Sequence, residues 1–332
     1  MQEHACDAIA AVCAVPPGTD SVQGHVRAHK AVDLGFVPAV VRAMTAHPSR
    51  GSVQASACRA VRSVCASGSS GQLSLASITS AGIEADQLPG VHTSVATISA
   101  RDVNRLSTAA RKTKVVDAGF VAAAVQAMEV HAAAVGVQEA ACWALEAVSS
   151  PDKGGDAGDP QSEQRCAKVA AAGAIARAVH VMSAHSSTTG ALEAALALVV
   201  VLGEGSPAGR PRRQLAAQEG FIPLAVAAMA AHPSHVGVQV RVCAAVLSIV
   251  SGMEASDVER KEAAMRAGFV PQASRALEVH AQHARVQQGA CLAIAALCAG
   301  KGAGADARAQ RVAEAGLLKA AVRAMQAHVQ DS

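Results

Sequence analysis

The chain has 332 residues, of which 51% are apolar, 17% charged and only 2% aromatic. Its net charge of +3 is too close to neutral for the electrostatic footprint of a nucleic-acid-binding protein, and it excludes a disordered charged tail as the main content. Alanine is the commonest residue, so we expect many small helices in close contact rather than one thick core.

The cysteines and the N-terminus predict a location. The nine cysteines are odd in number and form no C-x-x-C motif, which favours reduced thiols in the cytosol or nucleus over a secreted disulfide framework. We find no signal peptide at the N-terminus. The longest apolar run, 194–202, is far shorter than the roughly 18 residues that span a bilayer. We therefore expect a cytoplasmic, or else nuclear, protein without a membrane segment.

A glycine followed by an apolar residue recurs along the chain with companions at fixed distances. Twelve residues after it stands a histidine, and nine residues after it a methionine or a leucine. Twenty-three residues after the first five of these glycines stands a cysteine or, once, a leucine. The last four are 47, 48 and 48 residues apart, which indicates a repeated structural unit. These anchor glycines are Gly35, Gly119, Gly173, Gly220, Gly268 and Gly316.

Each unit is predicted to contain three helices. The first is short and ends at the anchor glycine in the left-handed conformation typical of helix C-caps, so we expect a positive φ at Gly119. The second begins at the third residue after the glycine, where Pro38, Pro223 and Pro271 fit a first helical position, and it ends near the histidine. The third begins at a Val-Gln pair and carries small and apolar residues at helical spacing.

In chain order, the predicted units cover about 1–14 (partial), 26–66, 73–104 (degenerate), 110–149, 164–204, 212–251, 259–299 and 307–332 (partial). The degenerate unit is inferred from Gly82, which lies 47 residues after Gly35 and is followed too soon by the next apolar helix pattern. Joints rich in Gly, Ser, Pro and Asp separate the units, as expected for loops. We predict a single all-α array of about seven units, two of them incomplete.

One segment resembles a known family. Residues 137–148 read V-Q-E-A-A-C-W-A-L-E-A-V, and the third helix of the armadillo repeat commonly reads V-Q-E-A-A-L-W-A-L-S-N-L, so eight of twelve positions agree. Three helices per unit with a short first helix are also typical of that family. The resemblance covers nearly all of 1–332 and implies a right-handed superhelical solenoid whose third helices line a concave groove.

The resemblance also directs attention to groove positions. In peptide-binding armadillo proteins, a Trp and an Asn four residues later form a ladder that holds the peptide. Here the Trp positions hold Asp7, Arg59, Trp143, Ala197, Ala244 and Leu292, and the Asn positions hold Ala11, Ser63, Ala147, Val201, Ser248 and Ala296. Without the Asn ladder, a peptide clamp of the nuclear-import type is disfavoured. The expected protein-binding groove is Arg59, Arg62, Trp143 and Glu146, unless Trp143 only fills a half-buried position.

Three other patterns favour a structural explanation. The histidines, including HPSH at 232–235 and HAQH at 280–283, occur once per unit at the end of the second helix, which favours capping over a metal site. The repeated cysteines favour core packing over a catalytic thiol. The RPRR sequence at 210–213 favours a solvated loop over a targeting signal. No motif for phosphate binding or catalysis is found, so we expect no cofactor and no metal.

We expect a non-enzymatic scaffold for protein–protein interactions, because stacked helices offer a long surface without a closed pocket. The two ends leave an alternative open. Residues 1–14 resemble a lone third helix, and 307–332 a first and second helix without a third. Their apolar residues, which internal units would bury, are Ile9, Val12, Leu317, Leu318 and Met325. Either the chain is a segment of a larger repeat protein, or copies self-assemble head to tail as a structural protein.

Overall fold

The computed structural model describes residues 1–13, 21–66, 108–151, 159, 161–204, 208–315 and 322–323. These residues are 81% helical, form 17 helices and contain no strand, which confirms the all-α prediction. The predicted degenerate unit at 73–104 lies outside the described residues, as do Leu317, Leu318 and Met325.

The helices follow one another in a recurring order of first, second and third. The first helices are α2 (Ser21–Asp33), α7 (Thr108–Asp117), α10 (Ser162–Ala171), α13 (Arg210–Gln218), α16 (Ala255–Arg266) and α19 (Ala303–Glu314). The second helices are α3 (Phe36–Ala46), α8 (Phe120–Val130), α11 (Ala174–Ala184), α14 (Phe221–Ala231) and α17 (Phe269–Val279). The third helices are α1 (Gln2–Cys13), α4 (Gly51–Ala66), α9 (Val135–Ser149), α12 (Thr189–Gly203), α15 (Val236–Val250) and α18 (Ala284–Cys298).

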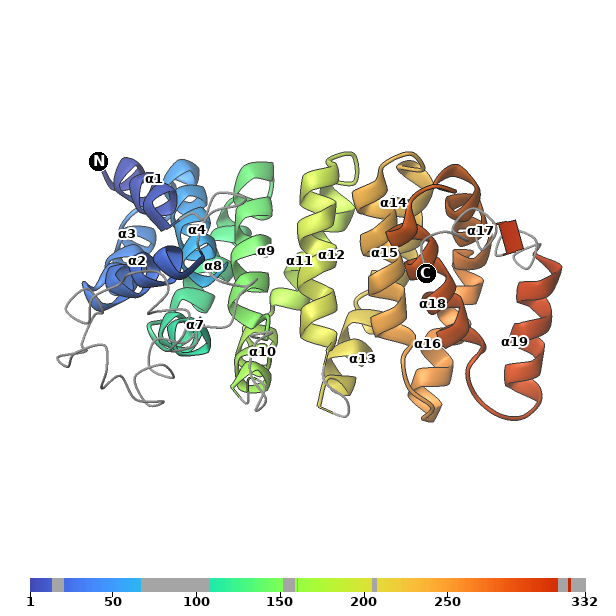
Figure 1. Cartoon of the computed structure of the whole chain (residues 1–332). Coiled ribbons are helices and arrows are strands. Elements are labelled where there is room, and N and C mark those ends of the chain that lie inside the picture. The colour runs from blue at the N-terminus through green and yellow to red at the C-terminus, as the bar shows by residue number, and fades with distance from the viewer. Residues whose placement is uncertain are drawn as a thin grey trace. The chain divides into compact units, whose positions relative to one another are not determined.

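The chain divides into two compact parts, Met1–Ala174 and Ile175–Ser332. In the N-terminal part, α1 packs against α4 and α4 against α9, while α3 packs against α8 and α7 against α10 (Figure 1). In the C-terminal part, α12 packs against α15 and α15 against α18, while α14 packs against α17. Helices of the same kind are therefore neighbours within each part. Because α4 and α9 pack directly, the helices of 26–66 and those of 110–149 are adjacent.

The anchor glycines separate the first helices from the second helices. The five that the structure describes have φ between 83° and 89°, and the φ of 88° at Gly119 confirms the predicted left-handed conformation. The second helix begins earlier than predicted, at the residue directly after the glycine. The third helical position is therefore occupied by proline in three of these helices, at Pro38, Pro223 and Pro271. Proline is tolerated there because the first N–H groups of a helix have no acceptor within the helix, so no hydrogen bond is lost.

A buried glutamine closes the end of four second helices. Gln138 at the start of α9 donates from Nε2 to the carbonyl oxygens of Met128 and His131, both at 2.8 Å. Three equivalent glutamines, Gln54, Gln239 and Gln287, make the same pair of bonds at 2.8–2.9 Å. Each histidine carbonyl also accepts a backbone N–H three residues later, as His131 O does from Ala134 N at 2.9 Å, so the glutamine adds a side-chain donor to the carbonyls at the helix end.

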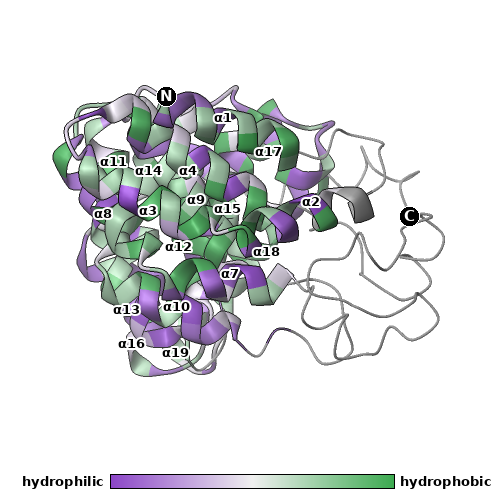
Figure 2. Ribbon diagram, turned by 90° about the vertical axis from the view of Figure 1, so that its left-hand side faces the viewer, coloured by the Kyte–Doolittle hydropathy of each residue, from purple (hydrophilic) through white to green (hydrophobic). Residues whose placement is uncertain are grey.

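An arginine eight residues before each anchor glycine joins a first helix to the third helix that precedes it. Its Nε donates to a carbonyl near the end of that third helix, and five of the six arginines are buried. The pairs are Arg27–Val12, Arg111–Val64, Arg165–Val148, Arg212–Leu202, Arg260–Ile249 and Arg308–Leu297. First helices such as α13 and α16 are visibly more hydrophilic than third helices such as α12 and α15 (Figure 2). The arginines Arg212 of α13 and Arg260 of α16 are nevertheless buried.

The RPRR sequence is not a solvated loop. Residues 210–213 form the first turn of α13, with Pro211 near the helix start. Arg212 and Arg213 are 8% and 4% exposed and donate to the carbonyls of Leu202 and Gly203 at the end of α12. The prediction was wrong because a cluster of positive charge is usually solvated, whereas here the negative end of a helix dipole faces it.

Candidate functional site

The candidate surface is the open side of the third helices in the N-terminal part. The α4 and α9 helices each bury most of their residues against their neighbours and leave one stripe accessible, whereas α1 buries only Cys6 and Cys13. On α4 the exposed residues of this stripe are Ser52, Arg59, Arg62 and Ala66. On α9 and its C-cap residue Ser150, the corresponding stripe is Gly136, Glu139, Trp143, Glu146 and Ser150, of which Gly136 is exposed and the others are half-buried. We call these two stripes, with Asp7 of α1, the open third-helix face.

Arg62 and Trp143 contact each other across this face. The guanidinium carbon of Arg62 lies over the Trp143 ring, 4.5 Å from its centroid. This is a cation–π distance, at which the face of the ring attracts the guanidinium. The structure thus brings together two of the four predicted groove residues, with Trp143 neither fully buried nor fully exposed.

Arg59 lies one turn from Arg62 and forms its ion pair with α1 rather than a contact with α9. Its Nη2 donates to Asp7 Oδ1 of α1 at 3.2 Å and to Ser56 Oγ at 2.7 Å. Asp7 was not among the predicted groove residues, although its position in the sequence indicates the contact. Asp7 and Arg59 occupy the same position of consecutive third helices, so stacking of α1 on α4 makes them neighbours.

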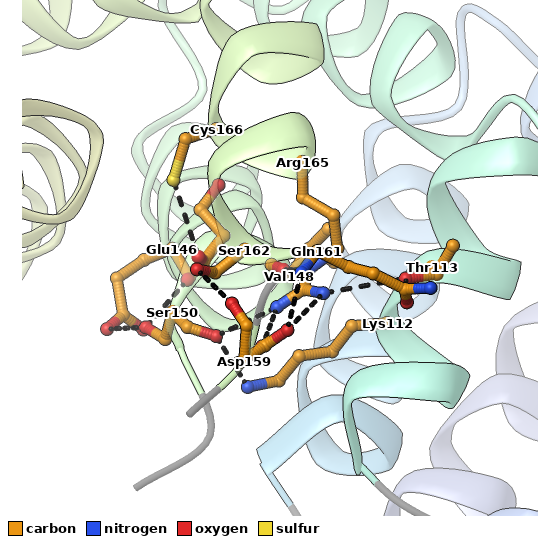
Figure 3. Close-up of polar contacts among 11 residues, drawn as sticks. Lys112, Thr113, Glu146, Val148, Ser150, Asp159, Gln161, Ser162, Arg165 and Cys166 are labelled. Atoms are coloured by element: carbon orange, nitrogen blue, oxygen red, sulfur yellow. Dashed lines mark hydrogen bonds and ion pairs between the residues drawn. The ribbon is translucent and has the colours of Figure 1, made fainter. Parts of the chain in front are cut away.

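The fourth predicted residue, Glu146, is tied to a polar cluster at the end of α9. Ser150 donates from Oγ to Glu146 Oε1 at 2.8 Å, while the Ser150 carbonyl accepts from Lys112 Nζ at 2.8 Å. Figure 3 shows how Arg165 completes this cluster, with its Nε on Val148 O at 2.8 Å and its guanidinium paired with Asp159. Glu146 is therefore oriented by the end of its own helix rather than by Trp143 or the two arginines.

The equivalent face of the C-terminal part has no aromatic residue at the Trp position. Ala197 of α12 is buried, and Ala244 of α15 is half-buried at the Trp position. At the Asn position, Val201 of α12 is buried, and Ser248 of α15 and Ala296 of α18 are half-buried. Leu292 of α18, at the Trp position, is 48% exposed.

The histidines lie at the helix ends as predicted: His131, His232 and His280 are the C-cap residues of their second helices, and their backbone N–H groups donate to a carbonyl of the helix. The contacts of their rings differ from the prediction. The rings of His131, His232 and His280 do not bond to their own helix ends, which the glutamines serve. Instead each Nε2 lies 2.7–2.8 Å from a carbonyl oxygen at the corresponding turn one unit earlier, and the acceptors are those of Pro48, Ser186 and Pro233. These rings therefore link consecutive units through the turns between second and third helices.

Seven of the nine cysteines are buried, as the packing explanation predicts. Burial raises the pKa of the Cys58 and Cys243 thiols to about 12, so neither is a ready nucleophile at neutral pH. Cys298 is half-buried, and Cys291 is exposed, which corrects the prediction for that residue. Among the described third helices, α18 packs closely against α15 alone, so the outer side of α18, which carries Cys291, stays open.

The described residues contain no group of three or more His, Cys, Asp or Glu side chains that could hold a metal ion. None of the helices in that portion of the chain is long and apolar enough to cross a membrane. The sequence matches no protein-family model, and a search of curated proteins finds no significant match.

Proposed function

We propose that this protein is a non-enzymatic scaffold of the armadillo type, which binds a protein partner on the open third-helix face. The repeated packing of like helices within each part supports a right-handed solenoid of three-helix units. The armadillo-like segment lies on α9, the helix that carries Trp143. The reduced, buried thiols suit a cytoplasmic or nuclear protein.

The observation that carries the proposal is the Arg62–Trp143 contact on an accessible surface. Trp and Arg are the residues most often found as interface anchors, and a half-buried Trp held by an arginine loses little conformational freedom on binding. The corresponding positions of the C-terminal part hold Ala197, Ala244 and Leu292, none of them aromatic or charged, so the two parts differ in what they offer a partner.

The test begins with capture of partners from cell extract on the immobilised protein, followed by mass spectrometry. The affinity of the captured partner is then measured for the Trp143→Ala variant. We expect a loss of about 2 kcal/mol or more if Trp143 anchors the interface. Unchanged affinity together with a lower melting temperature would mean that Trp143 serves packing alone.

Head-to-tail self-assembly stays a second prediction. Val12 of α1 is 57% exposed and Ile9 is half-buried, so the outer side of α1 is accessible in the isolated chain. Light scattering over a hundredfold concentration range, on the wild type and on Ile9→Asp, tests it. A constant monomer mass in both proteins would exclude this alternative.

A further inference from the structure

The outer side of α18 carries a stripe of accessible apolar side chains. Cys291 is exposed, Leu292 is 48% exposed and Cys298 is half-buried. Because Cys291 and Cys298 lie about two helical turns apart, they share this side of the helix. Among the described third helices α18 packs closely against α15 alone, and this packing leaves the stripe uncovered.

The same two positions are buried where a further third helix follows within the same part. In α4, which α9 follows, they are Cys58 and Cys65, and both are fully buried. In α15, which α18 follows, they are Cys243 and Val250, and both are again fully buried. A β-carbon built on Gly289 of α18 would lie 3.2 Å from the β-carbon of Cys243, so this side of α15 faces α18 directly.

The opposite side of a third helix is accessible on α1. Ala8, two residues after Cys6, is exposed. Its equivalents Ala60 of α4 and Ala293 of α18 are fully buried, and each lies on a helix that a third helix precedes and packs against. Alanine at this position lets two helices approach closely. His4, two residues before Cys6, is the equivalent of Gly289 and is exposed as well.

The packing of like helices identifies the occupant of the α18 stripe. Cys6 of α1 is buried, and among the described third helices α1 packs closely against α4 alone. One side of α1 therefore already forms a third-helix contact, whereas the side with His4 and Ala8 does not. Docking of that side on α18 would continue an interface that the fold uses within each part.

We propose that the outer side of α18 binds α1 of a second copy of this chain, with Cys291 of one copy next to His4 and Ala8 of the other. The contact joins two different surfaces, so its repetition gives linear oligomers. The inference rests on the head-to-tail alternative given above and assigns its contact surface on α18. It does not depend on the open third-helix face.

A cysteine cross-link tests which residues meet. In the His4→Cys variant, the new thiol would lie beside Cys291 of the next copy, at the spacing that position 289 has from Cys243 within one chain. Mild oxidation should then give a ladder of disulfide-linked oligomers on a non-reducing gel. The His4→Cys/Cys291→Ser variant should give no ladder. Glu129→Cys places an exposed thiol on α8 instead and controls for random collision.

Light scattering under reducing conditions measures the association itself. Cys291→Glu should weaken it about tenfold or more, because the contact would remove a carboxylate from water without a partner. Val279→Glu places the same charge on α17, at a residue that is 50% exposed, and should change the association little. Since both residues are exposed, the two variants should share the melting temperature of the wild-type monomer.

Three results would overturn the proposal. The first is a monomer at every concentration with no ladder from His4→Cys. The second is a ladder that persists without Cys291, and the third is association that Cys291→Glu leaves intact, since both would place the contact elsewhere. None of these measurements involves Trp143, so their failure leaves partner binding on the open third-helix face to its own test. Conversely, intact partner binding in Trp143→Ala would leave this proposal unaffected.

Discussion

Arg260 of α16 donates a hydrogen bond from Nε to the carbonyl oxygen of Ile249, 2.6 Å away near the end of α15. The last carbonyls of a helix lack partners within it and carry the negative end of its dipole, so a buried guanidinium there is both hydrogen-bonded and electrostatically favoured. Five further arginines form the same contact between a first helix and the preceding third helix. First helices are therefore joined to the preceding third helices by polar contacts as well as by apolar packing.

The Arg165→Met variant tests the energetic weight of this contact. Arg165 and Asp159 are 2% and 0% exposed, and the substitution leaves the Asp159 carboxylate and the Val148 carbonyl without this donor. Removal of one member of a buried ion pair costs about 3–5 kcal/mol, so we expect a clear decrease in the urea midpoint of unfolding.

Lys168→Met is the matched control on the same helix. Lys168 also forms an ion pair, with Asp117 at 2.7 Å, but the two side chains are 46% and 56% exposed. An exposed pair contributes about 0–1 kcal/mol, so this variant should stay close to the wild type. Similar losses in both variants would mean that burial does not distinguish these two contacts.

The sequence predicts the regular part of this structure well. Anchor glycines, helix type and the proximity of Arg62 to Trp143 follow from periodicity, because helical spacing determines which side chains share a face. The buried arginines also recur at a fixed distance from the glycines. Their role was not predicted, because each carbonyl that binds an arginine belongs to another helix. A local pattern such as RPRR therefore predicts solvent-exposed arginines, whereas in the fold Arg212 and Arg213 are buried against the end of α12.

Gly119→Ala tests the left-handed turn between first and second helices. A β-carbon at Gly119 would have no heavy atom within 4 Å, so the substitution introduces no clash. The cost is backbone strain at a φ of 88°, about 1–2 kcal/mol, and we expect a lower melting temperature. Gly136→Ala is the control, since Gly136 is also free of close contacts but lies within α9. That variant should gain up to about 1 kcal/mol, because alanine favours the helix. A loss of stability in both variants would contradict this explanation.

Two adjacent glutamines test the role of the buried amide. Gln287→Leu removes the donor that binds the carbonyls of Leu277 and His280 at 2.8 and 2.9 Å. The His280 carbonyl keeps its bond from the His283 backbone N–H at 2.9 Å, so the loss of the two Gln287 bonds should lower the free energy of unfolding by about 1–3 kcal/mol. Gln288→Leu changes the next residue, which is exposed, and should remain within about 0.5 kcal/mol of the wild type. A comparable loss in Gln288→Leu would show that the cost arises from the added leucine and not from the lost bonds.

The buried thiol of Cys58 predicts a specific loss of stability in alkali. Burial raises its pKa from the ordinary value of 9.0 to about 12 in the folded protein. Above pH 9 the unfolded chain therefore releases this proton while the folded protein keeps it, so the contribution is complete below pH 9 and is lost as the pH rises toward 12. The slope in this range is about 1.4 kcal/mol per pH unit for one such group.

The Cys58→Ala variant isolates this effect from other alkaline titrations. At pH 8 it should be less stable than the wild type, because the smaller side chain leaves a cavity in a fully buried position. By pH 10 the difference in the free energy of unfolding should shrink by about 1 kcal/mol, since only the wild type carries the thiol that ionises on unfolding. Urea denaturation at both pH values under reducing conditions measures it. Cys291→Ala, at an exposed thiol, should show a smaller change between the two pH values. A difference for Cys58→Ala that is the same at both pH values would show that its thiol titrates alike in the folded and unfolded chain.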